Sequence, residues 1–187
     1  MLKIKERQNA GIFKQRRMKK MRKEKMNNKG FSLVELIIVI AIMAILIVVL
    51  APQYLKYVEK SRNSTDVSNA TEMVTAMQVY AADPDVAAAD AFKEGVFTLT
   101  VNATGTTIGH SGTNDNTNAV KKAFFASGLS ATEDAPTTTC VSKTNWTDYV
   151  ITATVSNTGS ITFSYSSSTG DTAFKNMMAG KAVDATN

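Results

Sequence analysis

One carboxylate, Glu35, lies inside an apolar run, and it is the residue of this chain best placed to do chemistry. The run covers residues 31–50, where only Ser32 and Glu35 are not apolar. A carboxylate costs about 2.5–3.5 kcal/mol at the centre of a bilayer and less near its edge. Glu35 is therefore either tolerated at a membrane interface or kept there for a positively charged partner.

A cut in the chain before Phe31 would create such a partner, because it leaves a new α-amine at the start of the apolar run. In a bundle of subunits, this amine and the Glu35 of a neighbour displaced by a few residues would form an ion pair. A carboxylate left unpaired among apolar helices is penalised. Our hypothesis is that the pair sets the axial register of one subunit against the next.

The apolar run has the length of a single membrane span. A helix of its twenty residues covers about 30 Å, the thickness of a hydrocarbon core. Residues 1–30 hold twelve Lys or Arg against two Glu, so they are strongly basic and the rest of the chain is net acidic. Because positive flanks stay in the cytoplasm, the pattern predicts an anchor over residues 31–51 with all later residues outside. Basic charge confined to this flank disfavours nucleic-acid binding.

Residues 26–62 resemble the type IV pilin and pseudopilin family. The match consists of a basic leader, Gly30, Phe31 directly after it, Glu35 as the fifth residue from that junction, an apolar helix and Pro52. The resemblance implies that a prepilin peptidase cuts between Gly30 and Phe31 and N-methylates Phe31. It also implies that Glu35 recruits and registers the subunit during assembly.

The same resemblance implies partners and a location. An assembly ATPase and a polytopic platform protein would move the subunit from the cytoplasmic membrane into a helical filament of identical subunits at the cell surface. Residues 1–30 would be the cleaved leader, which is long for the family. Its start codon is therefore open between four methionines, namely Met1, Met18, Met21 and Met26.

A helix is predicted to continue from the anchor to residue 83, as an amphipathic segment over residues 52–83. Pro52 lacks an N–H and crowds the preceding turn, so we expect a kink near residues 48–52 in preference to a helix end. Beyond it, apolar positions at helical spacing make a narrow face that needs a sheet to pack on, formed by Val67, Ala70, Val74, Met77 and Ala81. Asp83-Pro84 should end the helix.

Residues 84–187 are predicted to form a β-rich outer head with a flexible tail. Phe97, Leu99 and Val101 alternate with polar residues, which is typical of a strand with one buried face. Residues 147–166 read as a β-hairpin. The fold class is therefore α+β, with a long N-terminal helix, half transmembrane and half amphipathic, packed on a small antiparallel sheet.

The rest of the head gives weaker patterns. Residues 104–118 read as a loop, and residues 119–125 as a short helix capped by Asn118 and ended at Gly128. From Ser166 the chain is rich in Ser, Thr and Gly, apart from a possible short turn over residues 174–178.

No set of side chains suggests an enzyme, a metal site or a cofactor. Cys140 is the only cysteine, so an intramolecular disulfide is excluded, and we expect it to be partly buried. His110 is the only histidine and lies in the expected loop, where an inert role is favoured. Two weak calcium candidates remain, the acidic residues Asp83, Asp85 and Asp90 and the turn at residues 113–116.

The combined interpretation is a structural subunit, a major type IV pilin that serves adhesion, motility or aggregation. A pseudopilin of a type II secretion or DNA-uptake system shares every N-terminal residue and is the first alternative. The second alternative is an uncut, single-pass membrane-anchored binding domain, which would retain its leader and have no need of Glu35.

Overall fold

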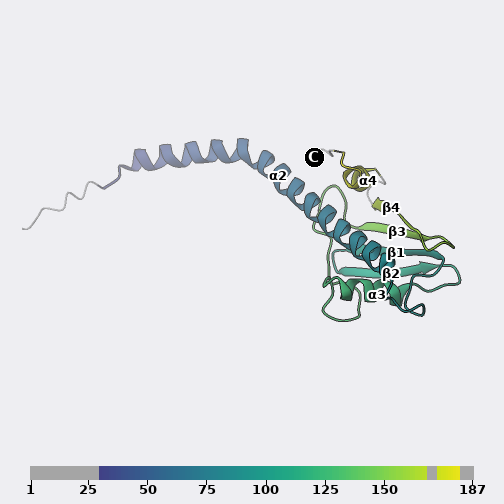
Figure 1. Cartoon of the computed structure of the whole chain (residues 1–187). Helices are drawn as coiled ribbons and strands as arrows, with labels where there is room; N and C mark the ends of the chain where they lie inside the picture. Colours follow the sequence, from purple (N-terminus) through teal and green to yellow (C-terminus); the bar gives the residue numbers. More distant parts are fainter. Residues whose placement is uncertain (1–29, 168–171, 182–187) are drawn as a thin grey trace, which may run out of the picture. The chain divides into compact units, whose positions relative to one another are not determined.

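The computed structural model describes residues 30–167 and 172–181, so most of the predicted leader lies outside the described residues. The chain divides into two compact units, residues 1–45 and 46–187. Figure 1 shows the elements in chain order: α2 (Leu33–Ala82), β1 (Gly95–Asn102), β2 (Gly105–Ser111), α3 (Thr117–Ala126), β3 (Tyr149–Val155), β4 (Ile161–Ser167) and α4 (Ala173–Met178).

Helix α2 begins in the first unit and ends in the second. Pro52 lies inside it, so a helix end at this proline is wrong. The kink that we expect near residues 48–52 stays a prediction. The helix ends at Ala82, directly before Asp83-Pro84, which confirms the predicted stop.

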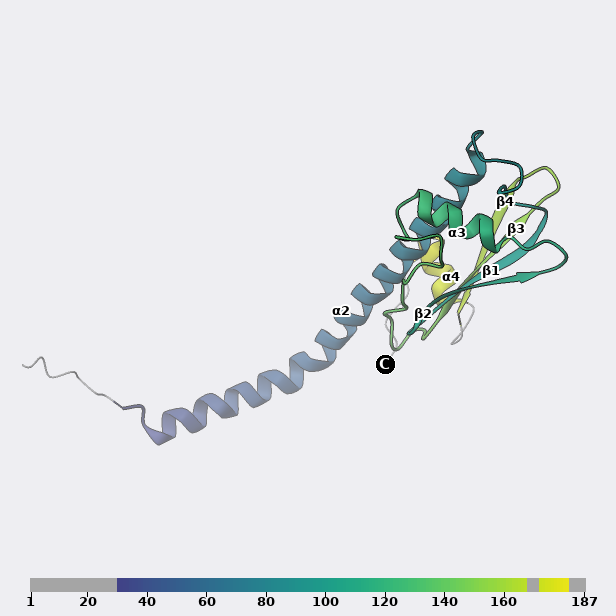
Figure 2. The same cartoon turned by 90° about the horizontal axis from the view of Figure 1, so that it is seen from below.

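The second unit contains a four-stranded antiparallel sheet in the order β2-β1-β3-β4. One face of the sheet is apolar and buried, as the alternation predicts, through Phe97, Leu99, Val101, Tyr149, Ile151, Ala153 and Val155. These residues form one core with the buried residues of α2 and α3. Figure 2 shows the last part of α2 and helix α3 lying along the sheet. The α+β class is confirmed, and so is the hairpin formed by β3 and β4.

The loop predicted over residues 104–118 is wrong, because strand β2 occupies Gly105–Ser111. It pairs with β1 through a tight turn in which Asn102 lies opposite Gly105, and Gly105 has a φ of 146°. The Asn102 side chain accepts the Thr104 N–H at 2.8 Å and stabilises this turn. As an edge strand, β2 has little buried surface, so its sequence lacks the apolar alternation that marks an inner strand.

Helix α3 follows Asn116, so the predicted cap at Asn118 is wrong. The Asn116 side chain instead joins the backbone of Lys93, accepting its N–H at 2.8 Å and donating to its carbonyl at 2.9 Å. The predicted end is confirmed. Gly128 has a φ of 78° and donates to the Phe125 carbonyl at 3.1 Å, while Leu129 donates to Phe124 at 2.9 Å. This pattern is a Schellman motif.

The possible short turn predicted over residues 174–178 is a helix, and it contributes to the core. Residues 168–171 and 182–187 of the predicted flexible tail lie outside the described residues. Helix α4 begins at Ala173, and Phe174 on it is fully buried. The Phe174 ring stacks on Tyr149 with centroids 4.5 Å apart and meets Trp146 edge-on at 5.3 Å. Trp146 is thereby a core residue. The sequence only weakly indicates that this segment packs on the core, because Phe174 is the one buried residue of the short helix.

The buried face of α2 is partly the predicted one. Ala70, Val74 and Met77 are buried, but Ala81 is exposed, because Tyr80 occupies the corresponding position and packs against Phe92 at 5.9 Å. Towards the anchor, the same face continues through three buried polar residues, Glu59, Asn63 and Asp66. Their steps of four and three residues match the helical repeat.

Asp66 ties the segment before β3 to this helix. Its carboxylate accepts the backbone N–H groups of Val141 at 2.9 Å and Ser142 at 3.0 Å, and the indole N–H of Trp146 at 2.9 Å. The Cys140 thiol donates to it at 3.3 Å. Burial, the Asp66 charge and this hydrogen bond raise the pKa of Cys140 to about 12, so the thiol is protonated and unreactive at neutral pH.

Glu59 holds the same segment two turns closer to the anchor, and only 4% of its surface is exposed. One carboxylate oxygen accepts the Ser142 hydroxyl at 2.7 Å and the N–H groups of Lys143 at 2.7 Å and Thr144 at 2.8 Å. The other lies 3.4 Å from Arg62. Burial alone would raise the pKa of Glu59, but the hydrogen bonds from Thr144, Ser142 and Lys143 outweigh it and lower the pKa to about 2.

Asp66→Ala should destabilise the head strongly, because it leaves the buried donors of Val141, Ser142 and Trp146 without an acceptor. Each such donor costs about 1–3 kcal/mol, so we expect a loss of at least about 3 kcal/mol. Denaturant unfolding of the full chain in detergent, followed by the fluorescence of its only tryptophan, measures this loss. The control is Glu72→Ala, an exposed carboxylate on the same helix, which should change stability by less than about 0.5 kcal/mol.

Glu59 should make the head sensitive to acid. Its pKa falls from 4.5 to about 2 on folding, so its stabilisation is complete above pH 4.5 and is lost as the pH falls towards 2. The contribution is on the order of 3 kcal/mol. Unfolding free energies measured across this range should decline more steeply for the native chain than for Glu59→Gln. Equal slopes would contradict the assignment.

Candidate functional site: the processing and assembly segment

The junction residues lie together at the start of the described chain. Gly30, Phe31 and Ser32 precede α2 and are exposed, with 90% of the Phe31 surface accessible. A Cβ placed on Gly30 would meet nothing within 4 Å. Among the residues that the structure describes, no contact therefore requires glycine at this position.

Ser32 and Glu35 form a capping box at the first turn of α2. The Glu35 carboxylate accepts the Ser32 backbone N–H at 2.8 Å, and the Ser32 hydroxyl accepts the Val34 N–H at 3.3 Å. The Ser32 carbonyl accepts the first helical bond, from Leu36 at 3.2 Å. These bonds satisfy N–H groups that a helix start otherwise leaves without partners.

The capping role of Glu35 escaped the sequence analysis, although the Ser-x-x-Glu spacing before an apolar run is its usual signal. The hydrogen bond to the Ser32 N–H holds the Glu35 carboxylate at the start of the helix. Phe31 is the residue directly before Ser32, so the carboxylate lies close to it in the chain. A carboxylate has about four acceptor sites, so one bond to the backbone leaves room for a cation. Glu35 can thus stabilise its own helix and also receive an α-amine.

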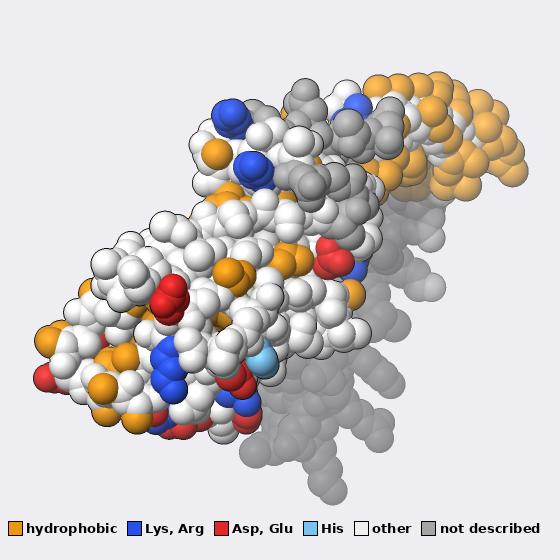
Figure 3. All heavy atoms as spheres, turned by 90° about the vertical axis from the view of Figure 1, so that its right-hand side faces the viewer, with side chains coloured by type: hydrophobic (Ala, Val, Ile, Leu, Met, Phe, Trp, Pro, Cys, Tyr) orange, Lys and Arg blue, Asp and Glu red, His pale blue; other side chains and the backbone are white. Residues whose placement is uncertain are grey.

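The surface behind the box is apolar and uncovered. From Leu33 to Leu50 every large apolar side chain is exposed, with about half or more of its surface accessible. Figure 3 shows hydrophobic side chains gathered on this helical stretch, whereas uncharged polar side chains and backbone predominate on the head. Helix α2 is long and apolar enough to cross a membrane, and none of its most apolar stretch is buried. A patch of this size needs lipid or other protein to cover it.

The remaining candidates do not converge on a site. The His110 ring lies 3.9 Å from Asp115 at the surface. Asp90 pairs with Lys122 at 2.7 Å, while Asp83 accepts the Asp85 N–H at 2.9 Å. Within residues 30–167 and 172–181, no group of three or more His, Cys, Asp or Glu side chains is placed to hold a metal ion. Pro52 lies in the second unit, away from the junction residues in sequence.

Comparison with known families finds one match, at the N-terminus. Residues 25–51 match the family model described as the prokaryotic N-terminal methylation motif, and these residues include Gly30, Phe31 and Glu35. No curated protein and no solved structure matches the chain. The match covers the junction, the capping box and the apolar stretch of α2. This chain carries the methylation motif that is the signature of type IV prepilins, joined to a long helix and an α+β head.

Proposed function

We propose that this chain is the structural subunit of a type IV pilus, a major pilin that polymerises into surface filaments. The observation that carries the proposal is the methylation motif over residues 25–51, continuous with an uncovered apolar helix whose first turn holds Glu35. An enzyme role has no support, since the motif belongs to structural subunits.

Processing would occur between Gly30 and Phe31. The junction is exposed and precedes the first helical residue, so a peptidase at the cytoplasmic face of the membrane can reach backbone that is not part of the helix. The open space around Gly30 supports recognition by the peptidase as the reason for glycine. Cleavage would place a new α-amine beside Glu35, and methylation of Phe31 would complete the mature N-terminus.

Assembly would transfer the apolar stretch from lipid to a bundle of identical helices. An assembly ATPase and a platform membrane protein would drive the transfer, and the heads would form the filament surface. In the bundle, the capping box holds each Glu35 carboxylate near the helix start, where the amine of a displaced neighbour can reach it. The ion pair would favour one register, because other registers leave a charge unpaired among apolar side chains.

Mass spectrometry of protein sheared from the cell surface tests processing and export together. We expect an N-terminal peptide that begins at Phe31 and is heavier by one methyl group. An intact leader, or protein confined to the membrane fraction, would contradict the proposal and support a single-pass anchored domain. A processed chain without abundant surface filaments would instead identify a pseudopilin of a secretion or DNA-uptake system.

Three variants separate the charge of Glu35 from its capping role. Glu35→Ala removes both, Glu35→Gln keeps an oxygen that can accept the Ser32 N–H, and Ser32→Ala removes only the hydroxyl cap. We expect both Glu35 variants to reach the membrane without assembling, because each lacks the charge. Ser32→Ala should still assemble, at a cost of about 1 kcal/mol in helix stability. Filament yield by shearing is the measurement, and normal assembly of Glu35→Gln would sink the ion-pair account.

A further inference from the structure

Beyond Leu50, the described part of the chain exposes large apolar side chains at two places only. Three of them, Tyr54, Leu55 and Tyr57, lie on α2 shortly after the second unit begins. The other two, Val79 and Phe125, lie near the ends of α2 and α3. About half or more of the surface of each residue is accessible. Exposed apolar side chains that gather in this way mark surfaces where another molecule binds.

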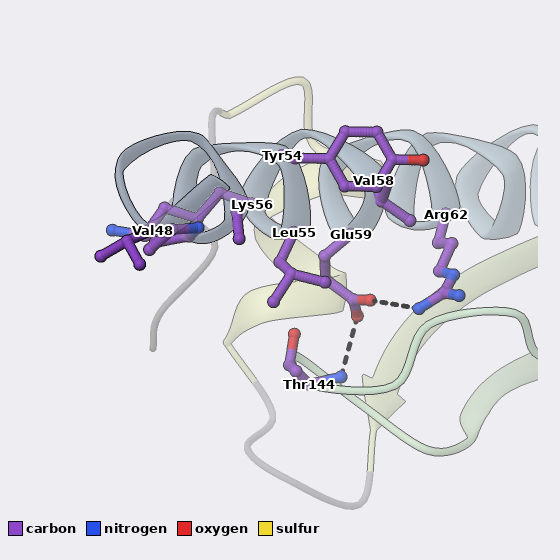
Figure 4. Close-up of a pocket in the computed structure, with 10 residues that line it drawn as sticks. Val48, Tyr54, Leu55, Lys56, Val58, Glu59, Arg62 and Thr144 are labelled. Carbon is purple, nitrogen blue, oxygen red and sulfur yellow. Dashed lines mark hydrogen bonds and ion pairs between the residues drawn. The ribbon is translucent and has the colours of Figure 1, made fainter. Parts of the chain in front are cut away.

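The first of these places is basic. Lys56 and Lys60 are exposed among its apolar residues, and neither forms an ion pair within residues 30–167 and 172–181. The carboxylate closest to them in sequence, Glu59, is buried and accepts the Thr144 N–H at 2.8 Å, as Figure 4 shows. Its charge is therefore engaged within the head. Residues 54–57 together with Lys60 are termed the basic surface.

The second place is acidic. Val79 lines a groove of about 440 Å³ together with Ser127 and Leu129, which follow Phe125 in the chain. Asp83 comes one turn after Val79, where α2 ends, and it is exposed. The four residues Val79, Asp83, Asp85 and Phe125 are termed the acidic surface.

The lysines near the acidic surface are already paired. The two lysines of α3 lie 2.7 Å from Asp90 and 3.9 Å from Asp134. Asp83 and Asp85 are both exposed and form no ion pair among the residues that the structure describes. Their two negative charges are therefore available to another molecule.

Tyr80 responds to the negative charge at this end of the head. Burial raises the pKa of its hydroxyl, and the carboxylates of Asp90, Glu133 and Asp83 raise it further. The Lys122 ammonium acts in the opposite direction and lowers this pKa. Carboxylates thus outnumber ammonium groups around the last turn of α2.

The two surfaces lie at opposite ends of one head. Lys60 and Asp83 are twenty-three residues apart, which is about 35 Å along a helix. They cannot meet within one chain, because α2 itself separates them. Either surface can meet its counterpart on a second copy displaced by about 35 Å along α2. Such a head-to-tail contact leaves one surface of each copy free for a further copy, so it repeats without closing.

We propose that the basic surface of one copy binds the acidic surface of a second copy in the filament. This inference rests on the proposed function, and it names the contact between heads that the filament would use. The apolar side chains of the two surfaces would form the centre of the contact, and pairs between lysine and aspartate would surround it. In a helical filament each copy has several neighbours at different axial displacements. This contact therefore adds to the ion pair of Glu35 and does not replace it.

A second copy is the occupant that accounts for both surfaces. Anionic lipid would offset Lys56 and Lys60, but it would leave the acidic surface uncovered about 35 Å away. A cationic partner at Asp83 and Asp85 would leave the basic surface uncovered in the same way. A second copy covers the apolar side chains of both surfaces and pairs the charges of both.

Two charge reversals of the full chain test the contact. One variant combines Lys56→Glu with Lys60→Glu, and the other combines Asp83→Lys with Asp85→Lys. Each variant alone presents the same charge at both ends of the head, so we expect the yield of sheared filaments to fall at least about tenfold. The two variants produced together in one cell should assemble, because the reversed surface of each matches the reversed surface of the other. A chain with all four changes should assemble as well.

Lys93→Glu is the matched control. Lys93 is exposed and lies in the segment between α2 and β1, beyond the acidic surface. Its reversal changes the net charge as much as the reversal of one lysine in the basic surface, but it adds negative charge to the acidic end. The filament yield of this variant should not fall. Tryptophan fluorescence during denaturant unfolding checks that every variant folds, and Lys60→Glu with Asp83→Lys is the pair to use where a double variant does not.

Two results would overturn the proposal. One is failure of the paired variants to assemble together as well as alone, although each is folded and cut before Phe31. The other is normal assembly of the variant with both aspartates reversed, which would leave the lysines to lipid or another anionic partner. A native chain that forms no filaments would overturn the proposed function instead.

Discussion

The uncovered apolar surface of α2 is the constraint on which the rest of this protein depends. From Leu33 to Leu50 the helix has no partner within the part of the chain that the structure describes, and its side chains are exposed throughout. Such a surface is stable only in lipid or against other helices. Under the proposed function, two environments in succession, a membrane and then a bundle of identical helices, would satisfy the same side chains. The basic flank would orient the chain in the membrane, and the carboxylate of Glu35 would specify the register in the bundle.

The head is attached to this helix by buried hydrogen bonds as well as by apolar packing. Glu59 and Asp66 lie on one face of α2 and hold residues 140–146 through backbone N–H groups, a hydroxyl and an indole. A buried carboxylate without hydrogen-bond partners is costly in free energy. Separation of residues 140–146 from α2 would therefore be unfavourable, because it breaks the hydrogen bonds to Glu59 and Asp66. Movement of α2 out of a membrane would therefore carry the head with it, as a filament subunit requires.

The sequence predicts those features that depend on local periodicity or on a run of one residue type. The apolar stretch, the buried faces of β1 and β3, and the end of α2 at Asp83-Pro84 are of this kind. Edge strand β2 and the burial of Phe174 depend on which segments meet in space, and no local pattern indicates them. The capping role of Glu35 could have been predicted from the sequence, because Ser32 precedes it at the Ser-x-x-Glu spacing of a capping box. The burial of Glu59 could not, because a carboxylate on a helix is ordinarily exposed and its donors lie more than 80 residues away.

The central claim is that other copies of the same helix cover the apolar stretch of α2 once the subunit leaves the membrane. Electron cryo-microscopy of filaments sheared from cells tests this claim most directly. The account predicts a filament whose dry core consists of residues 33–51 from many copies, each chain beginning at Phe31 with Glu35 close to the amine of a neighbour. A core built from another segment, or helices that face solvent within the filament, would contradict it.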